Sequence, residues 1–175
     1  METERILLRP WRDADAEMLF KYASDPDVGP RAGWSPHKNI EESHEIIQNY
    51  FSNDHTWAIE LKESNQVIGT IGYMLSGESN IEIGENDAEI GFWVAKPYWN
   101  QGICTEALQL LLDYCINTKH FCTLWGDYFV DNPASYRVMK KCGFKETNIT
   151  RYCNHLYGGQ QHPVKVLIYQ IEMLK

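Results

Sequence analysis

A strand, a short turn and a helix follow one another between residues 88 and 115, and this succession constrains the fold more than any other feature. From Ala88 to Val94, successive side chains are expected to alternate between the two faces of a strand. Ile90, Phe92 and Val94 fall on one face, and Glu89, Gly91 and Trp93 on the other. Pro97 lacks a backbone donor and ends the strand. One buried helical stripe is predicted downstream, at Leu108, Leu111, Leu112 and Cys115.

The turn between this strand and helix contains Gly102. A helix N-terminus presents unpaired N–H groups and the positive end of the helix dipole, which suits a phosphate or pyrophosphate. The turn is neither a Walker A loop nor a dinucleotide-binding fingerprint, because it lacks the Gly-Lys-Ser/Thr and the three spaced glycines. One glycine before a helix is more often ordinary turn chemistry than a phosphate site.

Three sequence blocks together resemble a known family. They are EIGFWVAKPYWNQGICTEAL at residues 89–108, Asn-Pro-Ala-Ser at 132–135 and Lys-Cys-Gly-Phe at 141–144. This combination resembles the GNAT superfamily of acetyl-CoA-dependent N-acetyltransferases, and most closely its ribosomal-protein-alanine (RimJ/RimL) branch. The opening Leu-Arg-Pro-Trp at residues 8–11 also fits that branch. The family's pyrophosphate loop reads Arg/Gln-x-x-Gly-x-Gly/Ala, and here Gly102 is kept while Trp99 and Cys104 depart from the pattern.

Composition limits the class of protein. The 175 residues, 43% of them hydrophobic, predict one globular domain spanning 1–175. The formal net charge of -8 argues against nonspecific nucleic-acid binding, which needs a basic surface. It is compatible with a cationic acceptor, although acidity also serves solubility.

The cysteines and the apolar runs bear on metal sites and location. None of the five cysteines forms a C-x-x-C pair, so we expect no structural zinc. The N-terminal residues are charged from Glu2 onward, and no apolar run approaches membrane-spanning length. We therefore expect a cytoplasmic protein without membrane partners and with reduced thiols.

The periodicity along the chain predicts an α/β (α+β) fold. Besides the central strand, we expect strands at 5–9, 56–61, 67–75, 122–130, 144–148 and 164–173, helices at 16–25, 39–51 and 134–142, and loops or turns at 28–38, 77–87 and 157–162. Asp13 and Asp15 stand where a helix cap belongs, and Gly143 where a C-cap belongs. The resemblance implies the GNAT acyltransferase fold, a mixed, mostly antiparallel twisted sheet flanked by helices.

The resemblance also implies how acetyl-CoA is held. By match, the pantetheine arm contacts the backbone of Phe92, Trp93 and Val94, and the pyrophosphate contacts Asn100, Gln101, Gly102, Ile103, Cys104 and Thr105. Asn132 matches the family asparagine near the coenzyme arm. In the family the central strand splays from its neighbour, so that its free amides face the ligand. Core packing for Phe92 and Val94, and helix capping for Asn132, are the structural alternatives.

Two residues match catalytic roles. Glu89, on the central strand, is the candidate base that takes the ammonium proton, directly or through water, and its alternative is a structural glutamate bonded to backbone. Ser135 matches the proposed proton donor to the thiolate in the ribosomal-protein branch, and its alternative is a helix-turn serine. Met139 stands where many family members have a tyrosine, and Tyr136 points about 100° away from Ser135 on a helix.

The acceptor site has weaker signals. Trp34 and His37, in the loop at 28–38, are candidate substrate-binding residues, and the alternative is a tryptophan that anchors the loop. His155 and His162 either line the acceptor site or lie exposed. The acidic stretch at 77–87 is a solvated loop or a lip for a cationic substrate. Cys104 is a small buried residue, or a nucleophile with a lowered pKa.

The expected function is direct transfer of an acetyl group from acetyl-CoA to a primary amine, either a protein N-terminus or a small molecule. The first rival is a catalytically inactive CoA-binding sensor, which Met139 favours. The second is an RNA- or ribosome-binding adaptor, which the acidic charge disfavours. The edge strands permit a monomer or a homodimer.

Overall fold

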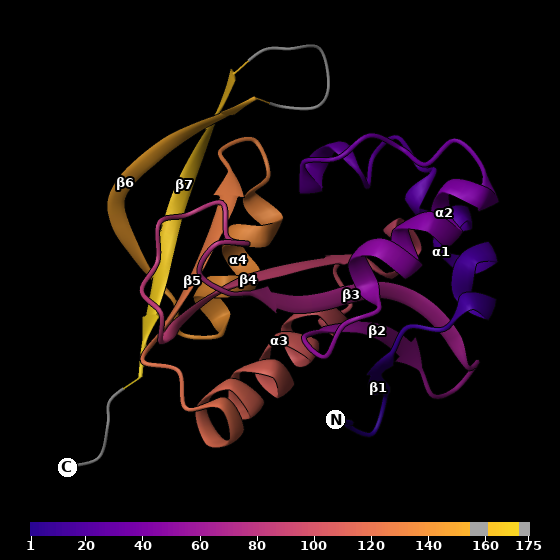
Figure 1. Ribbon diagram of the computed structural model, residues 1–175, viewed down its shortest axis with the longest axis horizontal. Helices are drawn as coiled ribbons and strands as arrows, with labels where there is room; N and C mark the ends of the chain where they lie inside the picture. Colours follow the sequence, from indigo (N-terminus) through magenta and orange to yellow (C-terminus); the bar gives the residue numbers. More distant parts are fainter. Residues whose placement is uncertain (155–160, 172–175) are drawn as a thin grey trace.

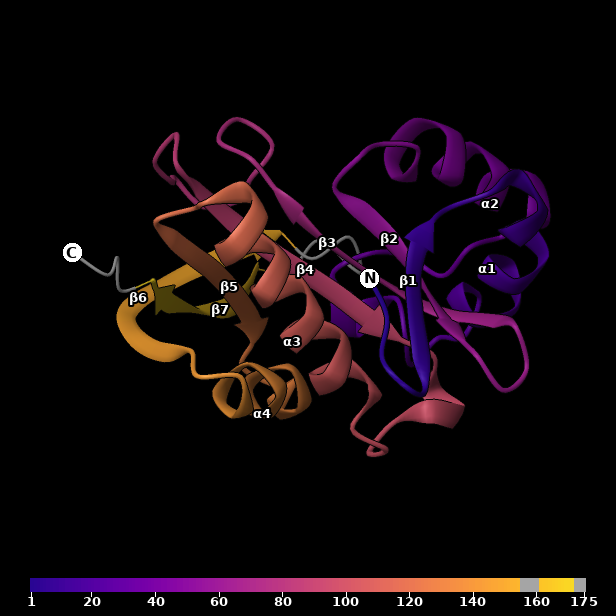
Figure 2. The same cartoon turned by 90° about the horizontal axis from the view of Figure 1, so that it is seen from below.

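A seven-stranded twisted sheet flanked by helices forms the protein, seen in a computed structural model that describes residues 1–154 and 161–171 (Figure 1). The strands are β1 (Ile6–Pro10), β2 (Thr56–Leu61), β3 (Gln66–Met74), β4 (Asp87–Val94), β5 (Thr123–Phe129), β6 (Lys145–Asn154) and β7 (Gln161–Gln170). The helices are α1 (Ala16–Ala23), α2 (Ile40–Ile46), α3 (Ile103–Tyr114) and α4 (Pro133–Lys141). α1 packs against α2 and β3, whereas α3 packs beside α4 and contacts β4 (Figure 2). The predicted fold class is confirmed.

The strand order is β1-β2-β3-β4-β5-β7-β6, and every neighbouring pair is antiparallel except β4 with β5. The parallel register begins at Asp87 with Thr123 and stops at Ile90 with Gly126. Beyond that point β4 stays paired with β3 as far as Val94, and β5 stays paired with β7 as far as Phe129. The two central strands therefore diverge, and each turns an edge toward the opening between them.

The core lies on both faces of β4. Ile90 and Val94 are buried on the face toward α3, and Glu89 and Trp93 are buried on the other face. The predicted helical stripe is confirmed, because Leu108, Leu111, Leu112 and Cys115 are all buried. A π-helical turn at Cys115–Lys119 extends α3 beyond its last α-helical residue.

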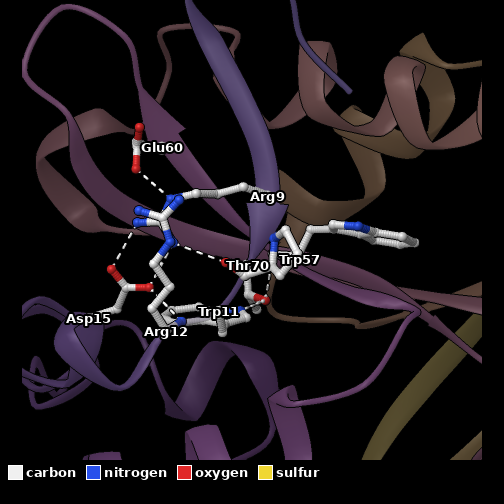
Figure 3. Close-up of polar contacts among 8 residues, drawn as sticks. Arg9, Trp11, Arg12, Asp15, Trp57, Glu60 and Thr70 are labelled. Carbon is white, nitrogen blue, oxygen red and sulfur yellow. Dashed lines mark hydrogen bonds and ion pairs between the residues drawn. The ribbon is translucent and has the colours of Figure 1, made fainter.

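The Leu-Arg-Pro-Trp block fixes the edge of the sheet to the first helix. The Arg9 guanidinium makes two hydrogen bonds to the Asp15 carboxylate, at 2.7 and 2.8 Å, and its Nε donates to Glu60 at 2.5 Å (Figure 3). The indole N–H of Trp11 donates to the Thr70 hydroxyl at 3.2 Å. These bonds to Asp15 hold the pKa of Arg9 above its ordinary value. The block is therefore a structural tie between β1, β2 and the start of α1.

Several local expectations differ from the structure. Asp15 stands at the N-cap of α1, but its side chain accepts from Arg9 and from the Arg12 backbone rather than from a helix amide. The second helix is capped by Asn39 and changes from α to π geometry at Ile47. Pro10 lies within β1, which an edge strand tolerates.

The last hairpin is longer than the periodicity predicts. β6 continues to Asn154, and β7 begins at Gln161, so that His162 lies in a strand. His155 and most of the predicted turn at 157–162 lie outside the described residues. Within 1–154 and 161–171, no helix has the length and apolar character needed to cross a membrane.

Candidate active site

A cavity of about 500 Å³ lies where β4 and β5 diverge. Its walls come from β4, the turn before α3, the first turn of α3, β5, the start of α4 and the loop after α1. Of the predicted coenzyme and catalytic residues, it is lined by Glu89, Phe92, Trp93, Val94, Asn100, Gly102, Ile103, Cys104, Thr105, Asn132 and Ser135. Gln101 is absent from the lining, and its side-chain amide donates instead to the Pro97 carbonyl at 2.9 Å.

The turn at the cavity has the geometry that an anion requires. Asn100 and Gly102 both adopt left-handed conformations, with φ of 61° and 79°, and no side chain caps α3. The first amides of α3 therefore have no partner within the helix, and Ile103, Cys104 and Thr105 line the cavity. Three cationic side chains line it as well, those of Arg31, Arg137 and Lys141. Free amides beside fixed positive charge suit the pyrophosphate of a coenzyme.

The two departures from the family's loop pattern have structural explanations. The indole N–H of Trp99 donates to the Val94 carbonyl at 2.6 Å, and the Arg31 guanidinium lies 5.5 Å from the Trp99 ring centre. Trp99 thus fastens the turn to β4. Burial raises the pKa of the Cys104 thiol above its ordinary value. The lowered pKa considered from the sequence is therefore wrong, and a protonated thiol opposes a covalent acetyl-cysteine route.

Glu89 is buried and fixed by the loop that precedes β4. Its side chain is 2% exposed, and Oε2 accepts hydrogen bonds from the Ser79 hydroxyl at 2.7 Å and from the Asn80 backbone N–H at 2.8 Å. The structural alternative is confirmed, because the carboxylate bonds backbone. Glu89 also lines the cavity, and its catalytic role stays a prediction. The exposed side chains of Glu78, Glu82 and Glu85 belong to the same loop.

Asp127 is a second carboxylate in the cavity, and no sequence motif predicted it as a site residue. In the parallel register Glu89 pairs with Trp125, and Asp127 follows two residues later on the same face of the sheet. Burial and then the charge of Glu89 raise the pKa of Asp127 to about 6, while Arg151 acts in the opposite direction. An acidic residue inside a predicted strand at 122–130 was the available signal, because strands disfavour aspartate.

Asn132 and Ser135 meet at the start of α4. The Asn132 amide donates to the Arg31 carbonyl at 2.9 Å and to the Ser135 hydroxyl at 3.1 Å. Asn132 occupies the N-cap position without capping the helix, so its alternative role as a cap is wrong. Because Ser135 accepts from Asn132, its own O–H remains free to donate.

The residues beside Ser135 on α4 point elsewhere. Met139 is 1% exposed and packs beneath Gly126, where an added Cβ would lie 2.6 Å from the methionine sulfur. The Tyr136 hydroxyl donates to Glu146 at 2.5 Å, and its ring stacks with Tyr128. Neither residue lines the cavity, which leaves Ser135 as the hydroxyl that α4 presents there.

The predicted acceptor residues lie behind the cavity wall. Trp34 packs edge to face on Trp93 at 5.7 Å, and His37 bonds the Ser43 hydroxyl at 2.8 Å while burial lowers its pKa. Neither lines the cavity, although Val28, Arg31 and Ala32 of the same loop do. Their role in acceptor binding stays a prediction. The ring centres of His162 and Phe129 lie 6.4 Å apart, and Phe129 lines the cavity.

Comparison with known proteins agrees with this geometry. The family profile described as "Acetyltransferase (GNAT) domain" matches residues 5–145. The Bacillus subtilis protein named uncharacterized N-acetyltransferase YoaA is 28% identical over 156 residues, which cover 86% of this chain and 85% of that protein.

Solved structures resemble this chain along almost its whole length. An acetyltransferase (GNAT family) from Bacillus anthracis superposes with a TM-score of 0.81 and 23% identity, covering 97% of each chain. Spermidine N-acetyltransferase from Vibrio cholerae, solved in complex with CoA and spermine, gives a TM-score of 0.76 and 17% identity over 96% of each chain.

Proposed function

This chain is an N-acetyltransferase of the GNAT family, and we propose that it transfers the acetyl group of acetyl-CoA directly to a primary amine. The divergence of β4 from β5 carries this proposal. It opens the sheet between two chemically different sides, the uncapped turn at Gly102 and the buried carboxylate of Glu89. A coenzyme held from one side and an amine arriving from the other would meet in that opening.

The coenzyme site combines backbone and charge. Phe92, Trp93 and Val94 supply strand backbone for the pantetheine arm, and residues 100–105 supply the turn for the pyrophosphate. The uncapped amides of α3 and the guanidinium of Arg31 fit that group, since both provide positive charge toward the cavity. Acetyl-CoA supplies the activated thioester, and no metal enters the proposed reaction.

The catalytic roles follow from position. Glu89 lies on the acceptor side of the opening, where its charge attracts an ammonium group and where the family match assigns the proton acceptor. Ser135 is oriented by Asn132 with its O–H free, and it is the proposed donor to the leaving thiolate. Trp34 supports the acceptor side through its contact with Trp93.

The acceptor is proposed to be a cationic amine. The carboxylates of Glu89 and Asp127 line the cavity, and their negative charge favours a protonated nitrogen over a neutral or anionic group. Both acceptor classes remain candidates: a protein N-terminus, as in the RimJ/RimL branch, and a small amine, as in the Vibrio cholerae neighbour bound to spermine. We further propose one GNAT domain over 1–175, a cytoplasmic location and a monomer or a homodimer.

Thiol release with acetyl-CoA tests this function. The purified protein is offered N-terminal peptides and small amines, and we expect turnover on at least one member of the panel. Glu89→Gln should lower kcat/KM for the amine far more than it weakens CoA binding. The rival function, a CoA-binding sensor, is favoured by the burial of Met139 at the tyrosine position. Tight CoA binding without turnover on any amine would support that rival.

A further inference from the structure

Two carboxylates line the cavity, and their surroundings differ. Glu89 and Asp127 lie on one face of the sheet, on the two strands that diverge. When two titratable groups have environments that separate their proton affinities, the acid and base roles follow from that separation. The inference below rests on the proposed function and concerns which carboxylate receives the amine proton.

The surroundings of Glu89 hold its carboxylate in place. Ser79 and the Asn80 backbone both donate to the same oxygen, Oε2, and so tie the carboxylate to the loop before β4. Glu89 is therefore fixed in position in the cavity wall, where it is suited to hold a cationic group.

The surroundings of Asp127 are the opposite. Within residues 1–154 and 161–171, no hydrogen bond reaches its carboxylate, and its one ion-pair partner is Arg151, with Nη1 3.8 Å from Oδ2. The charged groups that act on it are Glu89 from β4 and Arg151 from β6. Its side chain keeps 30% of its surface accessible and lines the cavity, so an incoming amine can reach it. Burial and then the charge of Glu89 raise the pKa of Asp127 above its ordinary value.

We propose that Asp127 accepts the proton of the acceptor ammonium and that Glu89 is the fixed carboxylate that holds the ammonium. This assigns to Asp127 the step that the family match assigns to Glu89. The proton moves from nitrogen to the Asp127 carboxylate, and the freed electron pair forms the C–N bond at the thioester carbon. The C–S bond breaks, and the nitrogen loses its second proton to solvent. The thiolate takes a proton from Ser135, which takes one back from solvent, and Asp127 returns its proton to solvent.

The pH dependence of kcat/KM for the acceptor tests this assignment. Wild type, Asp127→Asn and Glu89→Gln are compared from pH 5 to 9, with Asp113→Asn as the control for loss of one exposed carboxylate outside the cavity. We expect wild type and Asp113→Asn to rise through about pH 6 and then level off. Asp127→Asn should lose on the order of 100-fold or more at pH 7. Its deficit should shrink as pH approaches the amine's own pKa, because free amine then comes from solution.

The Glu89 variant distinguishes the two roles. Glu89→Gln should raise KM for the amine and move the rising limb to lower pH, because Asp127 loses its charged neighbour. The inference is overturned if Asp127→Asn keeps the wild-type pH profile. It is also overturned if the rise of kcat/KM near pH 6 is lost only in Glu89→Gln. A wild-type protein that acetylates no amine overturns the proposed function and this inference together.

A direct titration gives a readout that does not depend on turnover. With ¹³C-labelled aspartate, wild type should show one carboxyl resonance titrating near pH 6 that is missing from Asp127→Asn. In Glu89→Gln the same resonance should titrate at lower pH. An unchanged CoA dissociation constant in Asp127→Asn confirms that the coenzyme site is intact. A wild-type spectrum without such a resonance overturns the inference.

Discussion

Ile90 and Gly126 form the last backbone pair between β4 and β5, and the opening of the sheet begins directly beyond them. At Gly126 the strand also approaches α4 closely, since an added Cβ would lie 2.6 Å from the sulfur of Met139. The helix that carries Ser135 is thus seated on the strand that carries Asp127. The position of α4 and the start of the cavity depend on the same glycine.

The first prediction concerns this contact. Gly126→Ala should lower the free energy of unfolding by about 1–3 kcal/mol, because Met139 is fully packed and must move. Met139→Ala should cost about 2–5 kcal/mol by leaving a cavity. In the double variant the two costs should be less than additive by at least about 1 kcal/mol, because the smaller side chain admits the new methyl group. Urea denaturation of all four proteins measures the coupling, and simple additivity would contradict it.

The second prediction separates coenzyme binding from backbone strain. Gly102 and Gly77 both have positive φ, 79° and 93°, and neither added Cβ would meet an atom closer than 3.8 Å. Alanine at either position should therefore cost about 1–2 kcal/mol of stability from the left-handed backbone alone. Only Gly102→Ala should also weaken CoA binding, by about tenfold or more. Alanine disfavours the left-handed conformation at this position, and relief of that strain would move the amides at the start of α3. Calorimetric titration with CoA checks this, and equal affinities in the two variants would argue against a phosphate site at Gly102.

The turn at Gly102 was predictable from sequence because its geometry is local. A glycine with positive φ, a following amphipathic helix and a proline after the strand act through nearby backbone, so their spacing is visible in the chain. The same holds for the alternation of β4 and the stripe of α3.

Asp127 was not predictable in this way. Its basicity depends on the splay of β5 from β4, on burial and on Glu89, which lies 38 residues earlier in the chain. Tertiary contacts likewise determined that Asp15 bonds Arg9 instead of capping α1. They also determined that Trp34 packs on Trp93. Periodicity and local spacing carry no information about these long-range partners.

The third prediction concerns the proton donor. Ser135→Ala should lower kcat by about 10- to 100-fold while leaving the CoA dissociation constant unchanged, because the hydroxyl acts only when the thiolate leaves. Ser135→Thr keeps the hydroxyl and should restore most of the rate. An alanine variant with wild-type kcat, or a threonine variant as slow as alanine, would assign Ser135 to helix structure alone.

The last prediction concerns the effect of Asp127 on stability. Its pKa in the folded protein, about 6, lies above the ordinary value of 3.8, so the folded state binds more protons than the unfolded state between these two values. Stability contributed by this group is therefore complete below about pH 4, falls as pH rises to about 6 and is constant above that.

Asp127→Asn removes the buried charge and should stabilise the protein above pH 6, but not near pH 4. The shift of about two pKa units corresponds to at most about 3 kcal/mol, and we expect about 1–2 kcal/mol because 30% of the side chain is accessible and Arg151 loses its partner. Urea denaturation at pH 4, 5, 6 and 7, with Asp113→Asn as the control, measures the gain. An Asp127→Asn protein that gains nothing at pH 7, or gains equally at pH 4, would show that Asp127 is not held at a raised pKa. A stability gain of Asp127→Asn confined to high pH would show that the wild-type aspartate lowers the stability of the protein there. Such a cost is expected of a residue kept basic for its function.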